Sequence, residues 1–184
     1  MTGQRVVLVT GGSRGIGAAT CLLAAQSGYV VGVNYLHNAT AAGDVVAQIT
    51  SSGGKAIAVQ GNVSDEPDVV RMFDTVQETF GPVTALVNNA GILETQTRVE
   101  NMDAARLRRV LEANVIGSFL YAAEAVRRMS TRHGGPGGGI VNVSSRASVR
   151  GSPGEYVDYA MSKGAIDTLT IGLAKEVAAE GASG

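Results

Sequence analysis

The chain has 184 residues, a length that suits a single domain, and we expect residues 1–184 to form one domain around one sizeable core. It is 45% hydrophobic and 17% charged, with a net charge of −1 and no basic stripe, which argues against a nucleic-acid partner. No apolar run approaches the roughly 18 residues that span a bilayer, so no membrane partner is expected. The N-terminal segment lacks the apolar region of a signal peptide, and the single cysteine, Cys21, can form no intrachain disulfide. These features predict a cytoplasmic location.

Strand-like and helix-like segments alternate along the chain. The expected strands are apolar runs at residues 6–9, 30–33, 56–59, 83–87 and 140–143. The expected helices follow these strands at residues 15–27, 39–52, 64–80, 103–131 and 156–180. Five successive βα units predict an α/β fold with a Rossmann-type, doubly wound parallel sheet that binds its ligand at the carboxyl ends of the strands.

A glycine-rich turn joins the first expected strand to the first expected helix. Glycine lets a backbone turn tightly and approach a pyrophosphate without a Cβ clash, and the helix N-terminus supplies free N–H groups. An ordinary glycine-rich turn is the alternative, but the strand-turn-helix setting favours a dinucleotide site. The candidate cofactor contacts in this turn are Gly11, Ser13, Arg14, Gly15, Ile16 and Gly17.

The choice of cofactor depends on charge near the second strand. Folds that bind NAD usually place an acidic residue about 20 residues beyond the glycines, to bind the ribose 2′-hydroxyl. The first acidic residue of this chain is Asp44, inside the second expected helix, and the second strand ends in Asn34 and Tyr35 instead. Arg14 could bind a 2′-phosphate in a bidentate manner, although it could also be a solvated loop cation. The pattern predicts NADP(H) rather than NAD(H).

Tyr159 and Lys163 are four residues apart in the last expected helix, so their side chains share one face. An ammonium group nearby favours the phenolate form of a tyrosine, which suits a tyrosine that acts as a general acid and base. Tyr156 is no equivalent candidate, because Ala160 follows it by four residues. Taken alone, the pair is better explained as a chance spacing on an exposed helix.

Several motifs in chain order resemble the short-chain dehydrogenase/reductase family, from Arg5 to about Glu180. They are the Gly-x3-Gly-x-Gly turn, the Asn88-Asn-Ala-Gly91 segment, Asn114, the Ser144-Ser145 pair, and Tyr159 with Lys163. The resemblance implies an oxidoreductase that interconverts an alcohol and a carbonyl by hydride transfer with a nicotinamide cofactor. It implies a small-molecule substrate and no metal, and neither His37 nor His133 has metal-ligand spacing.

The resemblance also assigns catalytic roles. Tyr159 would be the general acid and base, Lys163 would hold the nicotinamide ribose, and Ser145 would bind the substrate carbonyl. Asn114 would position a water for proton relay, and a polar residue satisfied in the core is its alternative. Ser144 would have a structural role.

Two further segments would contact the cofactor. Asn62 and Val63 occupy the place where the family commonly has an Asp-Val pair against the adenine. Asn89, Ala90 and Gly91 would let the fourth strand lie close to the cofactor, and a plain polar turn is the alternative.

The family continues beyond the Tyr-Lys helix with two more strands and a substrate-covering lid. No strand is expected after this chain's last helix, so the sheet should lack the usual last two strands. Three interpretations follow: an NADP-dependent oxidoreductase, a shortened and impaired relative that retains cofactor binding at most, or a module without enzymatic activity.

The two longest expected helices bear on assembly. Relatives pair these helices across a two-fold axis, which implies a homodimer or homotetramer, and burial within one chain is the alternative for their apolar residues. The charged residues early in the first of them predict a solvated face: Asp103, Arg106, Arg108 and Arg109.

Overall fold

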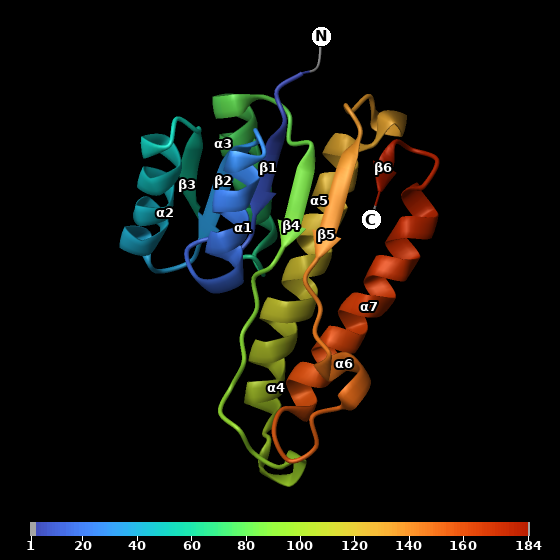
Figure 1. Ribbon diagram of the computed structural model, residues 1–184. Helices are drawn as coiled ribbons and strands as arrows, with labels where there is room; N and C mark the ends of the chain where they lie inside the picture. The colour runs from blue at the N-terminus through green and yellow to red at the C-terminus, as the bar shows by residue number, and fades with distance from the viewer. Residues whose placement is uncertain (1–2, 184) are drawn as a thin grey trace.

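One parallel sheet organises the computed structural model, which describes residues 3–183 (Figure 1). Its strands lie in the order β3-β2-β1-β4-β5-β6. Their bounds are Val6–Val9 for β1, Val30–Tyr35 for β2, Ala56–Gln60 for β3, Ala85–Asn88 for β4, Gly138–Asn142 for β5 and Ala182–Ser183 for β6. The chain moves outward in one direction from β1 to β3 and in the other from β4 onward. The strand order therefore reverses between β1 and β4. Sheets of this kind bind ligands at the carboxyl ends of the two strands that flank such a switch point.

The helices cover both faces of this sheet (Figure 1). Their bounds are Gly15–Gln26 for α1, Ala39–Ser51 for α2, Glu66–Phe80 for α3, Ala104–Leu111 for α4, Gly117–Met129 for α5, Ala147–Arg150 for α6 and Val157–Val177 for α7. Short helical turns, η1 at Val99–Asn101 and η3 at Thr131–His133, complete the set. The predicted strands and helices are thus present with small shifts at their ends. Neither α6 nor the short turns were predicted.

The position of β1 between two layers of helices explains why its sequence is apolar throughout. Val6 and Leu8 pack into one core with α3 and α5, whereas Val7 and Val9 pack into a second core with α1 and α2. All four side chains are buried because both faces of the sheet are covered. Cys21 of α1 is buried in the second core.

The predicted helix at 103–131 is a continuous rod that changes its winding in the middle. Asp103 caps α4 by accepting the backbone N–H of Arg106, and α5 ends at Met129. Between α4 and α5, residues Glu112–Ile116 form a π-helical turn, η2. The rod projects beyond the sheet, and α7 lies beside it (Figure 1). A π-helical turn inside a helix frequently marks a functional site.

The end of the chain corrects one expectation. We predicted no strand after the last helix, but α7 ends at Val177 and the two residues of β6 pair in parallel with β5. Gly181, with a φ of 67°, turns the backbone, and its carbonyl accepts the N–H of Gly138. The pairing extends the sheet past β5 by a two-residue strand. Among residues 3–183, no helix is both long enough and apolar enough to cross a membrane.

Candidate active site

The glycine turn has the shape of a cradle for a phosphate group. Gly11 and Gly15 have φ values of 61° and 54°, which L side chains rarely adopt. A Cβ on Gly17 would lie only 2.3 Å from the carbonyl oxygen of Gly11. Arg14 is the N-cap of α1 and makes no side-chain cap, so the first N–H groups of the helix keep no side-chain acceptor there. Free N–H groups, open space and a nearby cation suit a pyrophosphate.

The other candidate residues of the turn differ in exposure. The side chains of Arg14 and Ile16 are exposed, and Ser13 is half-buried. Within residues 3–183, Arg14 forms no ion pair, so its guanidinium is free to meet a phosphate.

The segment after β4 is tied directly to the glycine turn. The hydroxyl of Thr10 accepts the backbone N–H groups of both Asn89 and Ala90, each at 2.9 Å. The side-chain amide of Asn89 donates to the carbonyls of Thr10 at 2.9 Å and of Gly11 at 3.2 Å. These bonds fix Asn89 and Ala90 against the glycine turn, and their contact with a cofactor stays a prediction.

Asn34 faces the protein interior. Its side-chain oxygen accepts the N–H of Gly11 at 3.0 Å, and its amide donates to the carbonyl of Gly61 at 3.1 Å. The residue is 2% exposed, so a contact with the cofactor would pass through Gly11. Tyr35, the last residue of β2, is only half-buried.

Asn62 and Val63 lie just after β3. The side-chain oxygen of Asn62 accepts the N–H of Ser64, which orders the turn before α3, and Asn62 remains exposed. Val63 packs against Gly117, at whose position a Cβ would lie 2.8 Å from the valine side chain. The turn is thereby fixed against the first residue of α5.

Asn114 sits at the centre of the π-helical turn η2 and is fully buried. Its side-chain oxygen accepts the N–H of Ile92 at 2.7 Å, and its amide donates to the Ile92 carbonyl at 3.0 Å and to the Ser162 hydroxyl at 3.1 Å. The side chain thus ties the segment after Gly91 to α7. These bonds match the alternative of a polar residue satisfied in the core, and the proposed water relay stays a prediction.

Lys163 is buried with its ammonium group beside Tyr159. Its Nζ lies 5.6 Å from the centre of the Tyr159 ring and donates to the carbonyl of Val143 at 2.7 Å. A Cβ on Gly91 would lie 4.0 Å from the same Nζ. Burial lowers the pKa of Lys163, and the charge of Asp167 partly opposes this effect. The spacing of Tyr159 and Lys163 therefore places both on the inner side of α7, with Tyr159 half-buried.

Ser144 and Ser145, which follow β5, make different contacts, and these contacts indicate different roles. Hydrogen bonding from Ser144, and then from Ser148, holds the pKa of Asp167 below its usual range. The hydroxyl of Ser145 accepts the N–H of Ala147 at 3.1 Å and stays half-buried at the start of α6. Ser144 is thus engaged with α7, as a structural residue would be. The hydroxyl of Ser145 keeps its proton for another acceptor.

Arg106 corrects the prediction of a solvated face. Its guanidinium forms a fork on the carboxylate of Asp158, with Nε–Oδ2 at 2.7 Å and Nη2–Oδ1 at 3.2 Å. The exposed fractions are 8% for Arg106 and 5% for Asp158. Sequence reasoning missed this pair because the helical period alone does not say which charged residue of α4 turns toward α7. Asp158 precedes Tyr159 directly, and that position is the signal that could have drawn attention to it.

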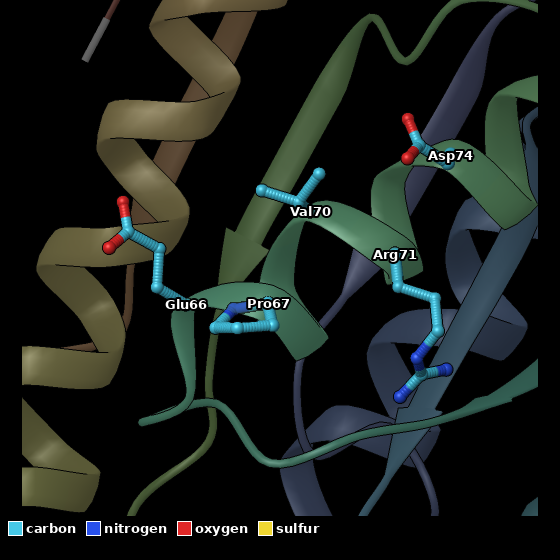
Figure 2. A pocket seen from close by; sticks show the side chains of 5 residues that line it. All are labelled: Glu66, Pro67, Val70, Arg71 and Asp74. Atoms are coloured by element: carbon cyan, nitrogen blue, oxygen red, sulfur yellow. The ribbon is translucent and has the colours of Figure 1, made fainter.

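Two surface hollows lie outside the Tyr159, Lys163 and glycine-turn group, and the second of them is lined in part by Asp158. One runs along α3 and is lined by Glu66, Pro67, Val70, Arg71 and Asp74 (Figure 2). Arg71 there is paired with Asp68, and Asp74 is paired with Arg128 of α5. The other is lined mainly by apolar side chains of η1, α4 and the start of α7. Neither holds Tyr159, Lys163 or the glycine turn, so neither defines the site.

Comparison with known proteins agrees with this geometry. A family model described as short chain dehydrogenase matches residues 5–182. The chain is 61% identical over 176 residues to the uncharacterized oxidoreductase YgfF of Escherichia coli (strain K12), covering 96% of this chain and 71% of that protein. It is 40% identical over 177 residues to a 3-oxoacyl-(acyl-carrier-protein) reductase of Synechocystis, covering 96% of this chain and 70% of that one.

A solved structure gives the same result. The crystal structure of a short chain dehydrogenase from Mycobacterium avium matches with a TM-score of 0.89 and 34% identity, covering 97% of this chain and 67% of that chain. The chain belongs to the short-chain dehydrogenase family and has the Rossmann fold of that family. It is an oxidoreductase of the NAD(P)-dependent short-chain type, and its sequence spans only part of the length of these relatives.

Proposed function

We propose that this protein interconverts an alcohol and a carbonyl with NADP(H), using Tyr159 as general acid and base. The observation that carries the proposal is the convergence of three elements on Gly91. A Cβ there would lie 3.1 Å from Asn114 Oδ1 and 4.0 Å from Lys163 Nζ, and Lys163 lies beside the Tyr159 ring. A cation next to a phenol is the arrangement that lets a tyrosine exchange a proton near neutral pH.

The residues of the glycine turn fit a dinucleotide. The position of a Cβ on Gly15 has no heavy atom within 4 Å, which leaves room for the pyrophosphate, while Gly11 and Gly17 let the turn pack tightly on Asn89. The start of α1 offers N–H donors to the pyrophosphate. When bound, the nicotinamide ring supplies or accepts the hydride. Among the described residues, the ammonium of Lys163 donates one hydrogen bond, to the carbonyl oxygen of Val143. Its other N–H groups are available to donate to ribose hydroxyls.

The preference for NADP(H) over NAD(H) rests on charge. Arg14 is exposed at the turn and has no ion-pair partner among residues 3–183, and the end of β2 offers Asn34 and Tyr35 in place of an acid. A guanidinium binds a phosphate through bidentate, charge-assisted hydrogen bonds. The exposed Asn62 and its neighbour Val63 would line the adenine side.

Proton transfer is assigned to this chain's own side chains. In reduction, the Tyr159 hydroxyl donates its proton to the carbonyl oxygen, and the Ser145 hydroxyl donates a hydrogen bond to the same oxygen. Lys163 stabilises the phenolate that remains. Asn114 fixes the strand-to-loop segment at Ile92 against α7, so that the groups on both sides keep their spacing.

The test separates turnover from binding. NADPH consumption is followed at its absorbance band with a panel of carbonyl compounds that includes a 3-oxoacyl thioester, and NADPH affinity is measured by calorimetry. Tyr159→Phe should abolish turnover while leaving NADPH affinity nearly unchanged, because the phenol acts only on the reacting proton. Near-normal turnover in Tyr159→Phe would exclude the proposed acid. Binding without turnover in the parent protein would select the impaired relative instead.

Assembly and location remain proposals. Four large apolar side chains are exposed on the α4–η2–α5 rod and on α7: Ile116, Phe119, Met161 and Ile171. By contrast, Ile166 of α7 is buried within the chain. An exposed apolar face on neighbouring helices supports a homodimer or homotetramer, which light scattering after size exclusion would test. The cytoplasmic location stays a prediction of the sequence.

A further inference from the structure

The buried ion pair between Arg106 and Asp158 holds together three parts of the chain. Besides its fork on Asp158, the guanidinium of Arg106 donates through Nη1 to the carbonyl of Thr95 at 2.6 Å. Asp158 Oδ1 also accepts the backbone N–H of Tyr159 at 2.9 Å. The pair therefore links α4, the segment after Gly91 and the first turn of α7, which carries Tyr159.

Stability alone is a weak reason for such a pair. Removing two charges from water costs free energy that their mutual attraction only partly returns, and apolar substitutes are often as stable. The surroundings are apolar, since Val99, Leu107 and Met161 line the hollow beside Asp158. An ion pair in this place calls for a role that apolar residues could not supply.

We assign to the pair the role of balancing charge at the residue before Tyr159, where the guanidinium of Arg106 neutralises the carboxylate of Asp158. Burial pushes the pKa of Asp158 up, but hydrogen bonds from Arg106 and from the Tyr159 N–H, with the charge of Arg106, hold it below its usual range. The carboxylate is therefore ionised at every pH at which a tyrosine ionises. Without Arg106 it would be an unbalanced negative charge hydrogen-bonded to the backbone of Tyr159, and it would oppose the phenolate.

We propose that Arg106 and Asp158 are positioning residues for Tyr159, which fix the first turn of α7 and cancel each other's charge at the backbone of Tyr159. The proposal rests on the proposed function, in which Tyr159 exchanges the proton. It assigns neither residue a contact with substrate or cofactor.

The other charges near this group lie on α7, on α4 and on the segment before α4, and they include Arg109, whose charge interacts with that of Arg106. Lys163 faces Tyr159 from the same helix, and Asp167 acts on Lys163. Glu94 and Asp103 act on Arg106 from the segment before α4 and from its N-cap. All of these stay in place when Arg106 or Asp158 is changed, so a shift in Tyr159 ionisation reports on the pair.

The direct measurement is the ionisation of Tyr159 itself. The chain has five tyrosines and no tryptophan, so its ultraviolet tyrosinate absorbance is not obscured. For the parent protein and for each variant, the titration curve of the same protein with Tyr159→Phe is subtracted, so that the difference reports Tyr159 alone. Circular dichroism shows over which pH range the protein stays folded, and only that range is used. This readout needs no substrate and no turnover.

The two single variants should act in opposite directions. Arg106→Gln should raise the pH of half-ionisation of Tyr159 by roughly one unit, because it leaves the carboxylate of Asp158 unbalanced. Asp158→Asn should lower it by a similar amount, because it leaves the guanidinium of Arg106 unbalanced. The double variant Arg106→Gln with Asp158→Asn should return to the parent value. A purely structural role would move both single variants the same way or not at all.

Controls keep the result decisive. Arg109→Gln breaks the exposed pair of Arg109 with Glu94 on the same helix and should leave the Tyr159 titration unchanged. Should Arg106→Gln fail to fold, Asp158→Asn and the double variant still decide. Shifts no larger than that of Arg109→Gln, or of one sign in both variants, would overturn the proposal. An absence of NADPH turnover with the opposite shifts intact would count against the proposed function alone.

Discussion

The side-chain oxygen of Asn34 accepts the backbone N–H of Gly11 at 3.0 Å, which ties the end of β2 to the glycine turn. The amide group of the same residue donates to the carbonyl of Gly61 and to the sulfur of Met72, and Met72 also accepts the hydroxyl of Tyr121. This place needs a side chain that both accepts and donates a hydrogen bond. An ionised carboxylate could only accept.

We predict that Asn34→Asp lowers the free energy of unfolding at neutral pH by about 3 kcal/mol, because a buried carboxylate would face the Gly61 carbonyl. Urea denaturation measures the loss. It should shrink at acidic pH, because burial raises the pKa of the new carboxyl in the folded state and its protonated form can donate. Asn38→Asp is the matched control, because the side-chain oxygen of this exposed N-cap of α2 accepts the N–H of Ala41, a bond that a carboxylate can also accept. The control should change stability by less than about 0.5 kcal/mol. Equal effects of the two would contradict the buried role of Asn34.

Gly17→Ala should damage the phosphate cradle. The new Cβ would meet the Gly11 carbonyl oxygen at 2.3 Å and the Asn89 amide at 2.6 Å, so the turn must move. We expect a loss of about 1–3 kcal/mol in stability and much weaker NADPH binding, measured by denaturation and calorimetry. Gly43→Ala in α2 meets nothing within 4 Å and should stabilise the protein by up to about 1 kcal/mol. Unchanged NADPH affinity in Gly17→Ala would argue against a cofactor at this turn.

Arg14→Ala should reduce the preference for NADP(H). A charge-assisted contact to a phosphate contributes about 1.5–3 kcal/mol, so NADPH affinity should fall by a factor of about 10–100 while NADH affinity stays the same. Calorimetric titrations with both cofactors measure the two affinities. Arg108→Ala removes an equal charge from an exposed position on α4 and should leave both affinities unchanged. Equal affinities of the parent protein for NADPH and NADH would refute the assignment.

Cys21 should resist alkylation in the folded protein. Burial raises the pKa of its thiol from 9.0 to about 12, so at about pH 8 only about one molecule in 10,000 carries the thiolate. Labelling with iodoacetamide should therefore follow the rate of unfolding. Because the unfolded thiol loses its proton first, stability should fall as the pH rises from about 9 to about 12. Cys21→Ala should reduce this slope, whereas the buried phenol of Tyr121, whose pKa burial also raises, keeps its own contribution. Rapid labelling of folded protein at about pH 8 would contradict the buried environment.

Local patterns were sufficient for much of the fold. The continuous apolar run of β1 predicted a strand covered on both faces, and Val6 and Val7 do pack into opposite cores. The glycines predicted a tight turn, and Gly11 and Gly15 have positive φ values there. Such features depend on side-chain period and backbone freedom, which neighbouring residues determine, so the sequence carries them directly.

The candidate site was predictable in its members but not in its contacts. The four-residue spacing placed Tyr159 and Lys163 on one face of a helix, as the structure has them. The same reasoning could not show that the Asn114 amide donates hydrogen bonds to the Ile92 carbonyl and the Ser162 hydroxyl, because Ser162 is 48 residues away in the chain. It also could not predict the π-helical turn that presents Asn114.

The sequence by itself thus determined the order of strands and helices, the glycine turn and the Tyr-Lys helix, because each rests on residues close together in the chain. Only the tertiary structure decided that Arg106 is buried on Asp158, that Asn34 faces inward, and that residues Ala182–Ser183 extend the sheet as β6. The physical reason is that a charged or polar side chain is buried only where another group can pair or hydrogen-bond with it. For Arg106 that partner lies 52 residues further along, on a helix that packing alone brings near.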